Sequence, residues 1–217
     1  MSITTATPQN PAVGGLQIGP LSDEEILLSY RQTRDADMFA QLVQRYEREL
    51  YNYLRRYLGG AESAEDVFQA TFLQVHLKCD RFEKGRKFRP WLYAIATNQA
   101  IDLQRRNQRH RAVSLNRSGY ENDDDVGRLM DLLESNEAGP LRQLQVAERR
   151  DWIRCELKTL PEHLRQVVLL VYYQKLKYRE AADVLSIAVG TVKSRLHSAI
   201  LKLNEAWHST KKYIQPK

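Results

Sequence analysis

Side chains that could read DNA gather near the end of the chain. An apolar pattern over 178–185, with the small residues Ala181 and Ala182, is followed by a break at 186–189 and by a second pattern over 191–207. Two short helices joined by a tight turn are typical of a helix-turn-helix, whose second helix enters the major groove and is polar on its outer face. The candidate DNA contacts on that face are Thr191, Lys193, Ser194, Arg195, His197, Ser198 and Lys202, of which Arg195 and Lys202 could reach phosphates.

Two ordinary amphipathic helices would give the same pattern, so the surrounding charge decides between the interpretations. The chain has 217 residues, with 33 Lys and Arg against 27 Asp and Glu, and a net charge of +6. Residues 81–111 carry nine basic and two acidic side chains, residues 158–217 carry eleven and four, and residues 116–140 carry two and seven. A solvated surface could explain any one run, but two basic blocks in a small chain favour two nucleic-acid contacts.

Composition argues against several other classes of protein. The hydrophobic content of 42% is enough for a core, while 10 Gly and 7 Pro disfavour a turn-rich β fold. Two cysteines, Cys79 and Cys155, cannot build a disulfide framework, which favours a reducing cytosol. No run approaches about 20 apolar residues, and no basic-then-apolar leader is visible, so neither a membrane span nor a secretory signal is expected.

Helical periodicity accounts for most of the chain, which predicts an all-α fold. Ser22 and Glu25 form a capping box for a short helix, and Gly59-Gly60 ends a long helix whose apolar positions begin at Phe39. A loop is predicted at 81–89. Further helices are predicted from a cap at Ser63, from Pro90 to about Arg109, over 144–160, from Pro161 through the apolar run 167–173, over 178–185 and over 191–207.

Aperiodic stretches divide the chain into two small helical domains. Residues 1–20 read as a disordered tail, and 113–140 read as a flexible acidic linker that contains Asp123-Asp124-Asp125 and Gly139-Pro140. The predicted domains are therefore 21–112 and 141–210.

Two motif sets, in this order, resemble the regions of bacterial sigma factors. Region 4 is similar to GTVKSRL at 190–196, together with LPE at 160–162 and RQV at 165–167. Region 2 is similar to AEDVFQATF at 64–72 and to FRPWLYAIATN at 88–98, followed by AID at 100–102 and Arg105-Arg106. The length leaves no room for the extra domains of housekeeping members, so the chain resembles the extracytoplasmic-function group of the sigma-70 family.

The resemblance implies a protein that is not an enzyme and needs no cofactor. It would bind core RNA polymerase at the β′ clamp and the β flap, and direct initiation by recognising a −35 duplex and −10 single-stranded DNA. It implies polymerase docking through Asp66, Gln69 and Phe72, although Phe72 could be core and Asp66 a helix-start carboxylate. Ala70 and Ser198 depart from the acidic residue and the arginine that are common at those positions.

The resemblance also implies that region 2 holds unpaired bases. Such binding needs cations along the backbone, and aromatic side chains or a pocket for the bases. Phe88 and Trp91 could equally be core, and for Trp91 the core is favoured. The implied −10 contacts are Arg81, Phe82, Lys84, Arg86, Lys87, Phe88, Trp91, Asn98, Arg105 and Arg106.

The same resemblance implies a path for the acidic linker and one further candidate partner. The acidic linker would thread a basic channel of the polymerase, and an anti-sigma factor is a candidate partner that the sequence does not name.

Three rival interpretations fit the sequence less well. A response regulator would alternate strands and helices in its first half, against the aromatic helical pattern of 36–110. An enzyme would need a recognisable nucleophile motif or a Gly-rich phosphate loop, and none is visible. His76 and Cys79 could supply two metal ligands, but no second pair follows, so no metal is expected. We therefore expect a cytoplasmic DNA-binding protein with core polymerase as its partner.

Overall fold

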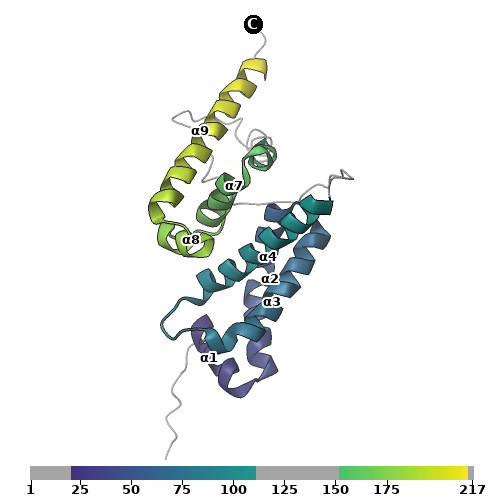
Figure 1. The fold of residues 1–217 in the computed structure, drawn as a ribbon, viewed down its shortest axis with the longest axis vertical. Coiled ribbons are helices and arrows are strands. Elements are labelled where there is room, and N and C mark those ends of the chain that lie inside the picture. Colours follow the sequence, from purple (N-terminus) through teal and green to yellow (C-terminus); the bar gives the residue numbers. More distant parts are fainter. Residues whose placement is uncertain (1–20, 111–151, 215–217) are drawn as a thin grey trace, which may run out of the picture.

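The structure is a computed structural model that describes residues 21–110 and 152–214 (Figure 1). The predicted tail, the predicted linker and the domain boundaries at 112 and 141 lie outside these residues. Within them the chain is helical and forms no strand, which confirms the all-α prediction.

Five helical elements make up an N-terminal bundle. They are α1 (Asp23–Thr33), α2 (Ala36–Leu58), α3 (Ala61–Lys78), the short 3-10 turn η1 (Cys79–Arg81) and α4 (Phe88–His110). A C-terminal bundle follows, with a helix over 152–159, α7 (Glu162–Val168), the π-helical segment η2 (Leu169–Tyr173), α8 (Tyr178–Leu185) and α9 (Val189–Ile214).

Local sequence signals set most helix ends. Ser22 and Glu25 form the expected capping box, and Gly59 ends α2 with a φ of 87°, which suits glycine. The cap predicted at Ser63 is wrong, because α3 already begins at Ala61 behind Gly60. Pro90 lies in the first turn of α4, as predicted, and the helix itself begins at Phe88.

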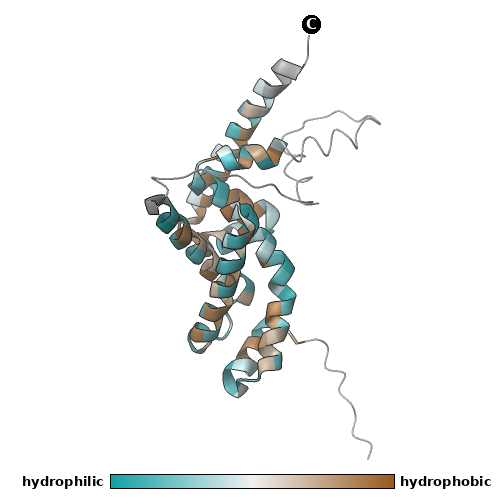
Figure 2. Cartoon of the chain, turned by 90° about the vertical axis from the view of Figure 1, so that its right-hand side faces the viewer, coloured by the Kyte–Doolittle hydropathy of each residue, from teal (hydrophilic) through white to brown (hydrophobic). Residues whose placement is uncertain are grey.

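The core of the N-terminal bundle forms around the long helix α2. Leu42, Leu50 and Leu54 lie fully buried on one face of α2, and the same face carries buried tyrosines. Figure 2 shows that apolar and polar residues interchange along the helices. This is the pattern expected of helices that bury one face in a core. This packing fixes the positions of α3 and α4, which flank α2.

The apolar run 167–173 contains a feature that its sequence pattern does not show. The α-helix gives way at Leu169 to the wider π-helical turn η2, which ends before a buried glutamine, Gln174. Lys175 follows with a φ of 53°, so the chain reverses sharply there. Gln174, which directly follows the wider turn, accepts a hydrogen bond from Tyr93 of the N-terminal bundle.

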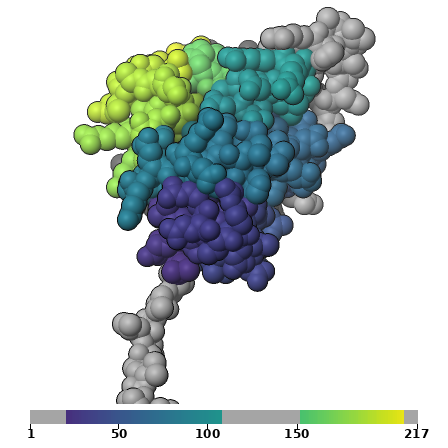
Figure 3. All heavy atoms as spheres, turned by 60° about the horizontal axis from the view of Figure 1, so that its bottom comes forward, coloured from purple at the N-terminus to yellow at the C-terminus, as the bar shows by residue number. Residues whose placement is uncertain are grey.

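The two bundles pack against each other, with α8 lying on α4. Figure 3 shows the green C-terminal residues directly against the teal residues of α4. The Tyr93 hydroxyl lies 2.7 Å from the Gln174 amide, and the Tyr57 hydroxyl lies 3.0 Å from the Glu162 carboxylate. These two polar contacts define what we call the interdomain contact.

Candidate nucleic-acid interface

The C-terminal bundle presents a helix-turn-helix, as the sequence predicts. α8 spans the predicted residues, and the turn at Ser186 takes a left-handed φ of 52° before α9 begins at Val189. Val192, Leu196 and Ala199 are buried on the inner face of α9, while Ala181 and Ala182 allow α8 to approach closely.

The outer face of α9 is polar and open at its N-terminal half. Lys193, Ser194 and His197 are exposed, as are Ser198 and Lys202 one turn further. Thr191 and Arg195 are half-buried, and the Thr191 carbonyl accepts a hydrogen bond of 3.1 Å from Ser194 Oγ. The structure thus brings the predicted −35 residues onto one helix, with the five exposed ones on a single outward surface.

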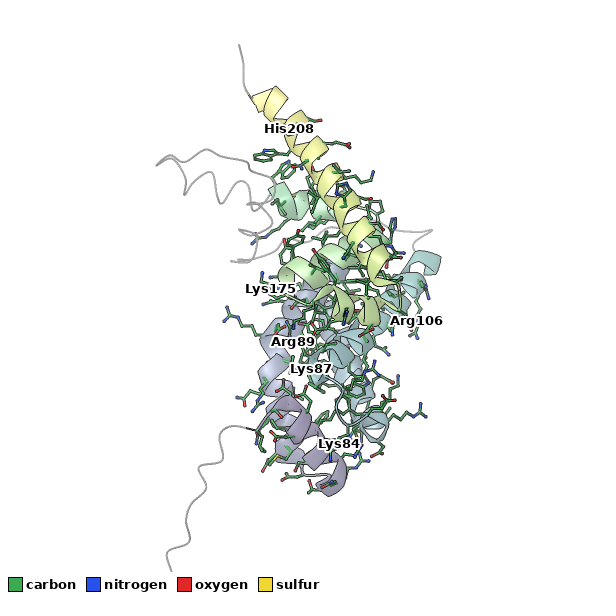
Figure 4. All side chains as sticks on the ribbon, turned by 90° about the vertical axis from the view of Figure 1, so that its left-hand side faces the viewer. Lys84, Lys87, Arg89, Arg106, Lys175 and His208 are labelled. Atoms are coloured by element: carbon green, nitrogen blue, oxygen red, sulfur yellow. The ribbon has the colours of Figure 1, made fainter. Side chains whose placement is uncertain are left out.

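A second cationic surface lies on the N-terminal bundle, just before α4. Residues 83–87 form an exposed loop between η1 and α4, which we call the basic loop because it carries Lys84, Arg86 and Lys87. Gly85 takes a φ of 91° at its tip, and Arg86 N–H donates to the Glu83 carbonyl at 3.1 Å. Figure 4 places Lys84 near α1 and Arg106 toward the far end of α4.

The aromatic residues beside the basic loop belong to the core. Phe82 and Phe88 are buried, with ring centroids 6.4 Å apart, and Trp91 packs edge-on against Phe82 at 5.1 Å. Phe82 and Phe88 therefore cannot offer a ring face to a base without rearrangement, and Trp91 is only half-buried. Sequence patterning does not separate these cases, because a core and a base-stacking platform use the same residue types.

The remaining predicted −10 residues are exposed, whereas a neighbouring arginine is paired within the bundle. Arg81, Asn98, Arg105 and Arg106 are exposed, and Arg105 lies 3.9 Å from Asp102. Arg89, which was not among the predicted contacts, forms an ion pair with Glu49.

The helix expected to dock on polymerase exposes a partly different set of residues. Asp66 and Gln69 are exposed on α3, and Gln69 donates to Glu65 at 3.0 Å. Phe72 is 5% exposed and packs against Phe39, so it is a core residue. Leu73 and Leu77, which were not among the predicted contacts, are 57% and 60% exposed. Their spacing of four residues, away from the buried stripe of α3, is the signal that could have identified them.

The residues considered as metal ligands have other contacts. His76 Nδ1 hydrogen-bonds the Tyr30 hydroxyl, and Cys79 is buried beside Arg34 Nη1 at 3.2 Å. Across 21–110 and 152–214, no three His, Cys, Asp or Glu side chains gather closely enough to hold a metal ion. In the same ranges no helix is long and apolar enough to cross a membrane.

Comparison with known proteins points to one family. The family models for Sigma-70 region 2 and for Sigma-70, region 4 match residues 42–110 and 150–203. The chain is 32% identical over 163 residues to ECF RNA polymerase sigma factor SigW of Bacillus subtilis, covering 75% of this chain and 85% of the relative. It is 28% identical over 177 residues to the ECF RNA polymerase sigma-E factor of Escherichia coli K12, covering 81% and 90%.

Solved structures share the fold. CnrH, in complex with the cytosolic domain of CnrY, matches with a TM-score of 0.61 and 24% identity over 86% of this chain and 97% of that chain. RpoE from Bartonella quintana, in complex with the anti-sigma factor NepR, matches with a TM-score of 0.58 and 23% identity over 77% and 94%.

Proposed function

Because this chain belongs to the extracytoplasmic-function group of the sigma-70 family and directs promoter-specific transcription initiation, we propose how its two surfaces divide that work. The outer face of α9 reads the −35 duplex, and the basic loop with the exposed face of α4 holds the −10 strand. The observation that carries the proposal is the open polar face of α9, with Lys193, Ser194 and His197 exposed together.

The proposed sites act through binding energy and not through catalysis. Core polymerase supplies the chemistry, and this chain supplies the choice of start site in the cytoplasm, where that polymerase works. The residues proposed for the −10 strand are Arg81, Lys84, Arg86, Lys87, Asn98, Arg105 and Arg106, with Phe82, Phe88 and Trp91 supporting the basic loop from the core.

We place the polymerase contact on the exposed face of α3. Asp66 and Gln69 provide oriented polar groups there, and Leu73 provides the apolar anchor that buried Phe72 cannot. An anti-sigma factor is a second proposed partner, on the precedent of RpoE from Bartonella quintana, whose structure is a complex with NepR.

Replacing Lys193 by alanine tests the −35 reader. If its ammonium group contacts a base edge, Lys193→Ala should weaken binding of the preferred −35 sequence by about 1–3 kcal/mol and relax selectivity at one position. The matched variant Lys202→Ala should instead weaken all sequences alike and lower the slope of log affinity against log salt by about 1. Footprinting of holoenzyme on a −35 library measures both, and an unchanged profile for Lys193→Ala at every promoter excludes this role.

Reading both promoter elements requires the bundles to separate. The names −35 and −10 put the elements 25 base pairs apart, which is about 85 Å of duplex at ~3.4 Å per pair, whereas α8 lies directly on α4. The 28 residues of the predicted linker 113–140 span at most about 100 Å when extended, so the chain is long enough.

Energy transfer between two dyes measures this separation. One dye goes on the exposed native Cys155 and the other on a Gln44→Cys variant, since Gln44 is exposed on α2. We expect the distance between the dyes to increase by tens of ångströms when core polymerase and promoter DNA are added. A distance that stays at the free-chain value would contradict simultaneous reading by the two surfaces.

A further inference from the structure

Two side chains of α1 hold the two ends of the basic loop. Arg31 Nη1 donates to the Phe82 carbonyl at 3.1 Å, just before the loop, and the Glu24 carboxylate accepts from Phe88 N–H at 2.8 Å, just after it. Glu24 and Arg31 are seven residues apart, which is two helical turns, so they project from the same face of α1. Figure 3 shows the purple α1 lying against the blue-teal residues beside it.

Both contacts satisfy backbone groups that the loop itself leaves open. Phe88 is the first residue of α4, and the first N–H groups of a helix have no partner within the helix. The Glu24 carboxylate fills that role from α1 and also places a negative charge at the positive end of the α4 dipole. Phe82 and Phe88 are buried, so the two backbone groups sit on rigid anchors.

The loop between these anchors has little other support. All five residues of the basic loop are exposed, and a Cβ atom placed on Gly85 would meet nothing within 4 Å. Within the backbone of the loop, Arg86 N–H donates a hydrogen bond to the Glu83 carbonyl. Its direction therefore depends on where its two ends are held.

α1 itself is fixed independently of the loop. Ile26 and Leu27 are buried in the core, and Asp23 accepts hydrogen bonds from Arg45 at 2.7 Å and from the Tyr46 hydroxyl at 2.5 Å. At its other end, Arg34 pairs with Asp80 of η1 at 2.8 Å. α1 is thus a rigid support that carries the two loop contacts on one face.

We propose that α1 is a positioning element for the −10 reader, and that Glu24 and Arg31 are its positioning residues. This inference rests on the proposed role of the basic loop. It extends that function to a helix outside the match to region 2, which begins at residue 42. By holding the loop ends, α1 sets the direction in which Lys84, Arg86 and Lys87 meet the strand, and so contributes to base selectivity.

The test compares variants of the full chain that differ only in the loop contacts. Glu24→Ala removes the acceptor of Phe88 N–H, and Glu24→Gln keeps a side-chain oxygen there. Arg45→Ala is the matched control, because it removes a contact between α1 and α2 that does not touch the loop. Hydrogen exchange of the Phe88 amide is measured on the free chain. Base selectivity at −10 and affinity for the −35 duplex are measured on the holoenzyme with a promoter library.

We expect Glu24→Ala to accelerate exchange of the Phe88 amide about tenfold or more, the effect of losing a hydrogen bond to a charged group. Base selectivity at −10 should fall several-fold while −35 affinity stays unchanged, and Glu24→Gln should restore most of both losses. Arg45→Ala should leave exchange and selectivity at the wild-type level.

Two results would overturn the inference. Exchange at Phe88 that is no faster in Glu24→Ala than in Arg45→Ala would show that α1 does not hold the loop. Faster exchange of the Phe88 amide with full base selectivity at −10 would show that the contacts of α1 with the loop do not contribute to that selectivity. A wild-type holoenzyme without base selectivity at −10 would be a different failure, because it would reject the proposed function of the loop itself.

Discussion

Replacing Lys84, Arg86 and Lys87 together by alanine should impair promoter opening far more than duplex binding. All three side chains are exposed on the basic loop, so their removal leaves the core intact. At about 1 kcal/mol for each close charge pair in water, the loss is about 3 kcal/mol, or roughly a hundredfold in the opening equilibrium. The salt dependence of strand binding should also weaken, by about 0.7 in slope for each lost phosphate contact.

Permanganate reactivity of unpaired thymines in the holoenzyme–promoter complex measures this opening. A charge-matched control replaces three lysines near the C-terminus, Lys211, Lys212 and Lys217, which belong to no proposed site. The control should open promoters like the wild type. Full permanganate reactivity in the loop variant would reject the basic loop as the holder of the −10 strand.

The second large effect concerns alkaline pH. Burial raises the pKa of Tyr53, whose hydroxyl bonds Thr97 at 2.7 Å. Burial, together with the charge of Glu49, raises the pKa of Tyr93. Burial likewise raises the pKa of Tyr46, with help from Asp23, and of Tyr57. In the unfolded chain these phenols ionise near pH ~10.

The direction of the effect follows from proton binding. Above about pH 10 the unfolded chain loses phenolic protons that the folded chain retains, so the free energy of unfolding falls as pH rises. Tyr53 and Tyr93, which are both fully buried, together contribute about 3 kcal/mol per pH unit. Tyr46 and Tyr57 add to this slope. Since domains are stable by only about 5–15 kcal/mol, two pH units above that point should remove roughly 6 kcal/mol or more, which is enough to unfold a chain at the lower end of that range.

Denaturant unfolding at a series of alkaline pH values, with tyrosinate absorbance recorded in parallel, measures the slope. Tyr53→Phe removes one of the retained protons and should make the slope shallower. Leu201→Ala, at a side chain that is 48% exposed and has no ionisable proton, should leave the slope unchanged. Tyrosinate that forms near its ordinary pKa in a chain that remains folded would contradict the burial of these hydroxyls.

Periodicity and capping predict most of this fold, because they are local properties of the chain. The predicted bounds of α8 agree with the structure, and the capping box at Ser22 and the glycine end of α2 are where the sequence places them. The start of α3 is missed because Ser63 belongs to a residue type that commonly caps helices. The cap in the structure is Gly60, which has no side chain to signal that role. The π-helical turn η2 also has no local signal, since its residues fit an ordinary helix equally well.

The candidate sites are less predictable than the helices that carry them. Charge patterns select Lys193 and the basic loop as candidates, because cations can be located in a sequence without tertiary information. Aromatic residues do not reveal their role in this way, and the structure buries Phe72, Phe82 and Phe88. The interdomain contact and the hold of α1 on the basic loop join residues far apart in the chain, which a reading of local patterns cannot bring together.

The most direct test of the whole account is reconstitution of the purified full chain with core RNA polymerase, followed by mapping of transcript start sites across genomic DNA. We predict a stable complex that initiates at a defined set of sites sharing one −35 and one −10 sequence, and that weakens when Asp66 and Gln69 are both replaced by alanine. Failure of the chain to associate with the core enzyme, or start sites identical with and without the chain, would contradict the account.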